Sequence, residues 1–255
     1  MSSLGIWSSI TRVGTTEPFD LQLARGQVGG HTGLEIFGYS PNIGNTAQGP
    51  MWEGQTQSGG LYTPPSSAAQ LVLVSSSATD DTTRSVIISG LDANFAPITE
   101  IIALNGTTNV TTTQSFLRIN SMYMASSTNT GTITAKISST TYAQINPGIG
   151  QTQMSIYTVP AGYTFYLSYV QYDAAIGFTS SAYMTAQEYN KDNSTGQLTI
   201  THQTVFVQKQ ETPFTVPIAH PEKMDIQFCV KASSGGPLTC SLYAGGHLIE
   251  NHMQG

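Results

Sequence analysis

The sequence predicts an all-β protein, with a single β-sandwich or jelly-roll-like domain and an extended N-terminal arm. Three observations lead to this prediction. Short alternating segments rich in β-branched and aromatic residues recur after residue 62, turn residues separate them, and no stretch keeps the 3.6-residue period of an amphipathic helix. The close spacing of these segments favours a sandwich or jelly roll over an α/β fold.

The clearest of these segments is the stretch 151–172, QTQMSIYTVPAGYTFYLSYVQY. Its two alternating runs flank Pro160, Ala161 and Gly162, which suit a short turn because proline fixes φ and glycine adopts positive φ. We therefore expect an antiparallel hairpin here. Alternation along the second run places Tyr163, Phe165, Leu167 and Tyr169 on one face, and Thr164, Tyr166, Ser168 and Val170 on the other.

Further strands are expected along residues 63–255, which we treat as the β-sandwich domain. The run 71–75 is short and apolar, as in a buried strand. Turn residues separate the remaining runs in pairs, which predicts further hairpins. The expected pairs are 84–89 with 98–104, 115–125 with 130–138, 180–189 with 197–207 across NKDNSTG, and 223–232 with 238–250.

Residues 1–62 form the expected arm, because glycines interrupt every run there and alternation is scarce. The arm nevertheless carries large apolar side chains, which a solvated linker usually lacks. They are Trp7, Phe19, Ile36, Phe37, Tyr39, Trp52 and Tyr62. Two readings remain open: the arm wraps its own domain, or it reaches a neighbouring subunit.

The composition excludes several classes of partner. Charged residues make up 9% of the chain, against about 25% in ordinary soluble domains. The net charge is -6 with nine Lys and Arg residues, so the positive surface that nucleic-acid binding needs is absent. No apolar run is long enough to span a membrane, and the N-terminus lacks the pattern of a signal peptide. We expect a protein that is made in the cytoplasm and binds neither nucleic acid nor membrane.

The two cysteines, Cys229 and Cys240, flank the turn SSGGP. If the flanking strands pair through their apolar faces, Cys240 lies opposite Val230 and Cys229 points to the other side. The sequence therefore predicts two free thiols.

Motifs that create reactivity are missing: there is no nucleophile elbow, phosphate-binding loop, zinc-ligand spacing or pair of carboxylates. The histidines are scattered at His31, His202, His220, His247 and His252. The adjacent Asp80 and Asp81 suit a solvated turn, and NKDNSTG lacks the closing glutamate of a calcium loop. We expect a protein that is not an enzyme, with no catalytic, cofactor-binding or metal-binding residues and no cofactor.

Two blocks carry a family resemblance. GLDANFAPITEIIALNGTTNVTTTQSFLRI (90–119) and GIGQTQMSIYTVPAGYTFYL (148–167) are similar to virion structural proteins of tailed bacteriophages. The segments 34–63 and HPEKMDIQFCVKAS resemble the same group in order and spacing. The resemblance implies a capsid decoration (cement) protein on the exterior of the virion, a homotrimer in contact with the major capsid protein and its own copies.

Within that role the arm would act as a strap, with Trp7, Phe37, Tyr39 and Trp52 as anchors, because buried aromatic side chains dominate interface energetics. An alternative is a tail or fibre protein that binds host-surface glycans, since Tyr163, Tyr166, Tyr169 and Tyr172 are candidates for stacking on sugars. A third reading, a carbohydrate-active enzyme, requires two carboxylates across a cleft, and most of the few acidic residues fall in apparent turns.

Overall fold

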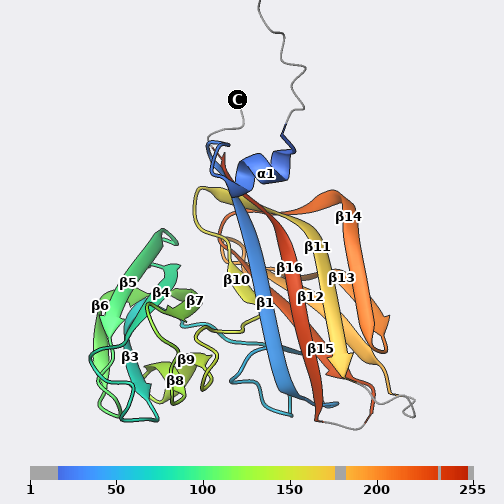
Figure 1. The fold of residues 1–255 in the computed structure, drawn as a ribbon. Coiled ribbons are helices and arrows are strands. Elements are labelled where there is room, and N and C mark those ends of the chain that lie inside the picture. Colours follow the sequence, from blue (N-terminus) through green and yellow to red (C-terminus); the bar gives the residue numbers. More distant parts are fainter. Residues whose placement is uncertain (1–16, 176–181, 235–236, 252–255) are drawn as a thin grey trace, which may run out of the picture.

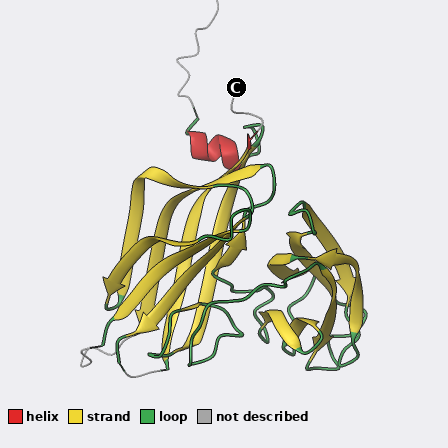
Figure 2. Cartoon of the chain, turned by 180° about the vertical axis from the view of Figure 1, so that it is seen from behind, coloured by secondary structure: helices red, strands yellow, loops and turns green. Residues whose placement is uncertain are grey.

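The computed structural model describes residues 17–175, 182–234 and 237–251. Its regular elements are antiparallel strands apart from one short helix, α1 (Phe19–Ala24), which confirms the all-β, sandwich-like prediction. The strands form two lobes, a larger one of long strands and a smaller one of short strands (Figures 1 and 2).

The larger lobe is a sandwich of two sheets. Sheet A consists, in spatial order, of β1 (His31–Ile43), β16 (Leu238–Glu250), β11 (Tyr163–Ala175) and β14 (Lys209–His220). Sheet B consists of β10 (Ile156–Thr158), β15 (Met224–Ala232), β12 (Met184–Asp192) and β13 (Leu198–Phe206), and β2 (Gly49–Pro50) also pairs with β15.

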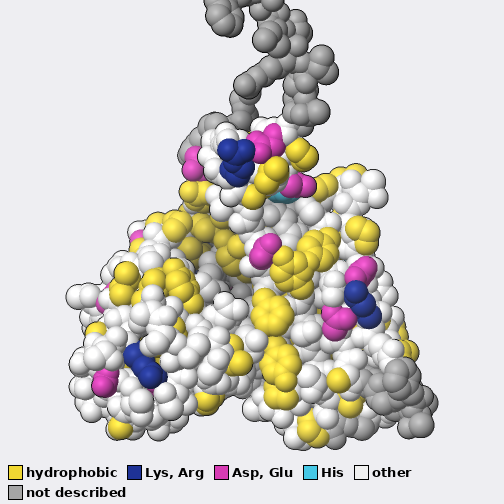
Figure 3. Space-filling view, in the orientation of Figure 1, with side chains coloured by type: hydrophobic (Ala, Val, Ile, Leu, Met, Phe, Trp, Pro, Cys, Tyr) yellow, Lys and Arg dark blue, Asp and Glu magenta, His cyan; other side chains and the backbone are white. Residues whose placement is uncertain are grey.

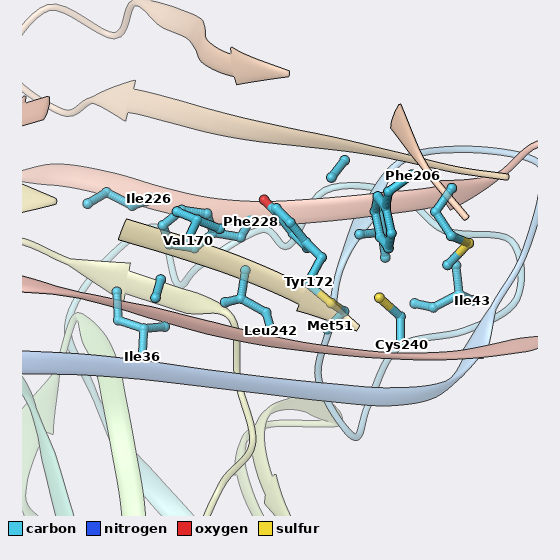
Figure 4. Packing of buried hydrophobic residues seen from close by; sticks show 14 of the residues in the cluster. Ile36, Ile43, Met51, Val170, Tyr172, Phe206, Ile226, Phe228, Cys240 and Leu242 are labelled. Atoms are coloured by element: carbon cyan, nitrogen blue, oxygen red, sulfur yellow. The ribbon is translucent and has the colours of Figure 1, made fainter. Parts of the chain in front are cut away.

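Alternating side chains of both sheets meet between them in one hydrophobic cluster (Figure 4). Val170 and Leu242 enter it from sheet A, and Phe228 enters it from sheet B. At its centre the ring of Tyr172 stacks on Phe206 with 5.5 Å between the ring centroids. Burial of these side chains supplies the main force that holds the sheets together.

The smaller lobe contains two further sheets around a hydrophobic cluster of its own. Sheet C consists of β6 (Val110–Phe116), β3 (Ala69–Ser75), β8 (Ile133–Ile137) and β9 (Thr140–Ile145). Sheet D consists of β5 (Pro97–Ala103), β4 (Ser85–Leu91) and β7 (Arg118–Met124). Residues 63–255 therefore contribute to two lobes, where the sequence suggested a single domain, and the strands of the smaller lobe are inserted between β2 and β10.

The segment expected to be an extended arm is largely part of the sandwich. Residues 31–43 form β1, which pairs with β16 along its whole length and buries Ile36 and Ile43 in the sandwich core. Gly49 and Pro50 pair with β15. The alternation that reveals a strand is hidden in β1 because Gly33, Gly38 and Pro41 interrupt its apolar positions.

The predicted hairpin of residues 151–172 is wrong, although its turn chemistry is right. Gly162 has φ of 80°, as the turn requires, but β10 pairs with β15, whereas β11 pairs with β14 and β16. Around the turn Val159 N–H donates to Met224 O at 3.0 Å, and Ala161 N–H donates to Phe95 O at 2.9 Å. The turn thus carries the chain from sheet B to sheet A.

Of the other predicted pairs, two are confirmed and two are wrong. β4 pairs with β5, and β12 pairs with β13 across the turn that contains Gly196. In contrast, β7 pairs with β4 while β8 pairs with β3 and β9, and β15 and β16 lie in different sheets. Alternation identifies a strand, but it does not identify the neighbour when the connection changes sheet.

The prediction of two free thiols is confirmed, since Cys229 and Cys240 are both unpaired and buried. The register argument behind it is wrong, because Cys229 belongs to sheet B and Cys240 belongs to sheet A. Val230 pairs with Ala186 and not with Cys240.

Candidate functional site

The outer face of sheet A carries a cluster of aromatic side chains, which we call the aromatic surface. It consists of Phe37, Tyr39, Tyr169 and Tyr243. In β1 the buried Ile36 alternates with Phe37, whose exposed fraction is 38%. Strand register sets Phe37 opposite Tyr243 on β16. Apolar side chains accordingly follow a line over the central strands of this face (Figure 3).

A β-bulge directs Tyr169 onto this face. The pairing of β11 with both of its neighbours shifts between Leu167 and Tyr169, so the buried positions change from odd to even numbers, from Leu167 to Val170. The ring of Tyr169 lies 5.3 Å from that of Tyr243, tilted by 55°. Gly245 leaves room for it, since a Cβ there would come within 3.1 Å of Tyr169 Cε1.

Beside the aromatic surface, under α1, lies a hollow of about 530 Å³. Tyr169, Tyr243, Leu23 and Leu34 supply its apolar lining, and Asp20, Glu35 and His247 supply polar groups. Phe19 of α1 packs edge-on against His247, with 5.6 Å between ring centroids, which fixes the helix over one end of the hollow. Partial burial raises the pKa of Tyr169, and the carboxylates of Glu35 and Glu211 raise it further.

The hollow combines aromatic walls with the carboxylates of Asp20 and Glu35, the imidazole of His247 and the hydroxyl group of Ser168. Among the described residues, no three His, Cys, Asp or Glu side chains come together as metal ligands would. The described part of the chain also contains no helix long and apolar enough to cross a membrane.

One pair of titratable groups that the sequence did not reveal lies inside the sandwich. His220 Nε2 of β14 is 3.1 Å from Glu188 Oε1 of β12, and Asn190 Nδ2 donates to the same oxygen at 2.9 Å. Desolvation raises the pKa of Glu188 and lowers that of His220 to about 4, so burial favours the neutral form of each. Both side chains are sealed from solvent, so this pair is part of the core and not an active site.

The four predicted anchors lie in different parts of the protein. Phe37 and Tyr39 lie on the aromatic surface, as an anchoring role requires. Trp52 is buried in the cluster of the smaller lobe, where it packs edge-on against Tyr62 with 5.7 Å between ring centroids. It therefore holds the fold together and is not available as an anchor. Trp7 lies outside the described residues.

The tyrosines predicted to stack on sugars do not all lie on one face. Tyr172 is fully buried in the sandwich core, whereas Tyr169 faces outward. Both follow the bulge, after which the even-numbered positions of β11 point inward. Asp80, expected in a solvated turn, is buried and accepts hydrogen bonds from Ser75 Oγ at 2.5 Å and from the N–H groups of Thr130 and Gly131 at 2.8 Å each. Its partners are up to 51 residues away, which local sequence does not show.

Comparisons with known proteins assign no family. Neither a protein-family model nor a curated protein sequence matches the chain. Two solved structures are similar at a low level, those of infectious bursal disease virus strains Gt and Gx. Each is 12% identical with a TM-score of 0.18 and covers 93% of this chain, and the match covers 79% and 78% of those chains. A TM-score this low carries no argument about fold or function.

Proposed function

We propose that this chain is a non-enzymatic structural protein of a tailed-bacteriophage virion, and that it decorates and stabilises the exterior of the capsid through intersubunit contacts. Its partners would be the major capsid protein and its own copies, as a homotrimer. The observation that carries the proposal is the aromatic surface, a row of partly exposed aromatic side chains on a rigid sheet.

The geometry of this surface suits adhesion. Phe37 and Tyr243 stand on paired, hydrogen-bonded strands, so little conformational freedom remains to be lost on binding. Aromatic side chains are the commonest source of interface energy, and charged groups at the centre of an interface are costly to desolvate. Glu35 is a charged residue close to Tyr169, whereas Lys209 and Glu211 belong to the edge strand β14, where an interface would have its polar rim.

The test uses purified heads that lack the protein. Recombinant Phe37→Ser and Tyr243→Ser variants should bind these heads about 30-fold more weakly than the wild type, the effect expected of interface residues worth about 2 kcal/mol each. Ile101→Ser is the matched control, since Ile101 is 64% exposed on the smaller lobe. Unchanged binding of both aromatic variants, with thermal unfolding that shows them to be folded, would contradict the proposal.

A second candidate is a tail or fibre protein that binds host-surface glycans. The observation that favours it is the hollow, in which Tyr169 and Tyr243 offer ring faces and Glu35 offers a hydrogen-bond acceptor for hydroxyl groups. Copy number separates the two candidates, because a decoration protein is as abundant as the capsid subunits that it contacts. A low copy number, together with glycan binding that Tyr243→Ser abolishes, would favour the second candidate.

A further inference from the structure

Within the described part of the chain, strand β13 is an open edge of sheet B that carries a row of exposed aliphatic side chains. It pairs with β12 on one side and ends the strand order of its sheet on the other. Four large aliphatic side chains along it and just after it are about half exposed. They are Leu198 at 52%, Ile200 at 49%, Val205 at 54% and Val207 at 53%.

A second β-bulge brings these side chains onto one face. The pairing of β12 with β13 shifts between Glu188, opposite His202, and Tyr189, opposite Ile200, so that Thr201 is the extra residue. The partners of Ile200 and Val205 are then Tyr189 and Thr185, odd-numbered residues of β12 that alternate with its buried positions. Without the bulge, Ile200 and Val205 would point to opposite faces.

The segment is also uncharged. Residues 197–208 (QLTITHQTVFVQ) contain no Asp, Glu, Lys or Arg, in a chain with a net charge of -6. Natural edge strands are usually protected by charges, prolines or covering segments, because free backbone N–H and C=O groups invite another strand. An exposed uncharged strand of β-branched residues is therefore a surface on which a second strand can pair.

The other sandwich edges among the described strands are protected. β14 contains Pro213 and Pro217, which cannot donate backbone hydrogen bonds, and a Lys209–Glu211 ion pair. Part of the β1 edge is covered, since Tyr39 N–H donates to Gln153 O at 3.2 Å. The edge of β10 is covered by the smaller lobe, where Asn120 Nδ2 donates to Thr158 O at 3.0 Å.

We propose that β13 is a docking edge for a second copy of this chain, which adds its own β13 in antiparallel orientation and joins the two B sheets into one. A second copy fits for two reasons. Neutral segments of an acidic protein meet without the repulsion that its other surfaces would bring, and the row is self-complementary. If Leu198 lies opposite the partner's Val205, then Ile200 lies opposite the partner's Gln203, and outward side chains match outward side chains along the strand.

This inference does not depend on a role in a virion. A pair of identical strands related by a two-fold axis closes with two copies, so within a homotrimer the same contact would join two trimers into a hexamer. The mass in solution therefore tests the docking edge, whereas binding to heads tests the proposed function.

The first experiment is sedimentation of the full chain over a wide range of concentrations. We expect reversible two-fold association, seen as a dimer with twice the monomer mass of 27.2 kDa, or as a hexamer where the proposed homotrimer also forms. Ile200→Lys and Val205→Lys should each weaken the pairing by more than about tenfold, because each places a charge on the edge strand, as naturally protected edge strands do. Val216→Lys on β14, where Val216 is 79% exposed, is the matched control and should leave the dimer unchanged.

The second experiment tests the register by cross-linking. The double variant Leu198→Cys/Val205→Cys should form a covalent dimer on mild oxidation, while the single variant Leu198→Cys should not. The natural thiols Cys229 and Cys240 are buried and should remain reduced. A monomer at every concentration, a trimer, a dimer that both lysine variants leave intact, or cross-linking of the single variant would overturn the proposal.

Discussion

Arg118 of β7 and Asp225 of β15 form a bidentate ion pair that joins the smaller lobe to the sandwich. Arg118 Nε lies 2.8 Å from Asp225 Oδ1, and Nη2 lies 2.9 Å from Oδ2. The guanidinium also donates to Pro65 O, Leu117 O and Asn193 Oδ1, so every one of its five N–H donors has an acceptor. Thr158 Oγ1 donates to Asp225 Oδ1 at 2.6 Å.

We predict that Arg118→Ala and Asp225→Ala each lower the free energy of unfolding by about 3–5 kcal/mol, because each leaves a charged partner buried without compensation. Arg118→Lys should recover little of this, since an ammonium group cannot make the planar two-point contact. Urea unfolding checks the values, and a separate early transition would show that the lobes unfold independently once the pair is broken.

Lys209→Ala is the matched control, since the Lys209–Glu211 pair has a comparable separation of 2.5 Å but both side chains are more than half exposed. Its cost should be small beside that of breaking the buried pair, because solvent screens such pairs. Equal costs for the buried and the exposed pair would contradict the role assigned to Arg118.

Gly38 tests whether β1 is part of the sandwich and not a detachable arm. A Cβ at Gly38 would lie 2.5 Å from Ser155 Cβ and 2.9 Å from Met51 O. Ser155 cannot move freely, because its Oγ accepts from Met51 N–H at 2.8 Å and donates to Phe228 O at 2.7 Å. Gly38→Ala should therefore destabilise the protein by about 1–3 kcal/mol, as overpacking does.

Gly33→Ala is the control in the same strand, because a Cβ at Gly33 meets no atom within 4 Å. It should be neutral or stabilise by up to about 1 kcal/mol, through the lower entropy of the unfolded chain. Chemical denaturation of both variants gives the comparison. Similar unfolding midpoints for the two would mean that β1 does not pack as described.

Glu53 is expected to make stability fall as pH rises. Burial raises its pKa from 4.5 to about 7, against the opposing effect of backbone hydrogen bonds that include Gln153 N–H. Because the folded state holds this proton more tightly than the unfolded state, the contribution of Glu53 to stability is full below pH 4.5 and is lost as pH rises through about 7. The loss amounts to about 3 kcal/mol at most.

Glu53→Gln should abolish that part of the pH dependence and raise the unfolding temperature above neutral pH relative to the wild type. Glu35→Gln, at an exposed position of β1, should leave the profile unchanged. The comparison is a series of thermal unfolding curves between acidic and mildly alkaline pH. A Glu53→Gln profile that runs parallel to the wild type would contradict the assignment.

Local sequence was enough to predict the all-β class and the β4–β5 and β12–β13 hairpins. These depend on alternation, turn residues and composition, which are properties of neighbouring positions. It failed where the chain changes sheet, as at Gly162, because the same turn chemistry serves a hairpin and a connection between sheets. It also failed for β1, because glycines interrupt the alternation of apolar residues that identifies a strand.

The sequence predicted only part of the candidate site. Phe37 and Tyr39 were identified as large apolar residues that need a partner, and they do lie on the surface. Tyr169 and Tyr172 are three positions apart, so alternation alone places them on opposite faces. The bulge decides which of the two points inward, and it leaves no mark in the sequence of its own strand. The opposing glycines, Gly245 and Gly246, were the one available signal.

The two thiols offer a direct measure of how tightly the sandwich is closed. Burial raises the pKa of both Cys229 and Cys240, and the thiolate is the reactive form, so both should resist labelling. We predict that a thiol-specific reagent labels neither in the native protein and labels both in denaturant, because reaction requires the sandwich to open. Rapid labelling of Cys229 alone would contradict this prediction. It would show that β2, whose Pro50 pairs with Cys229, detaches from β15 while the core around Cys240 stays closed.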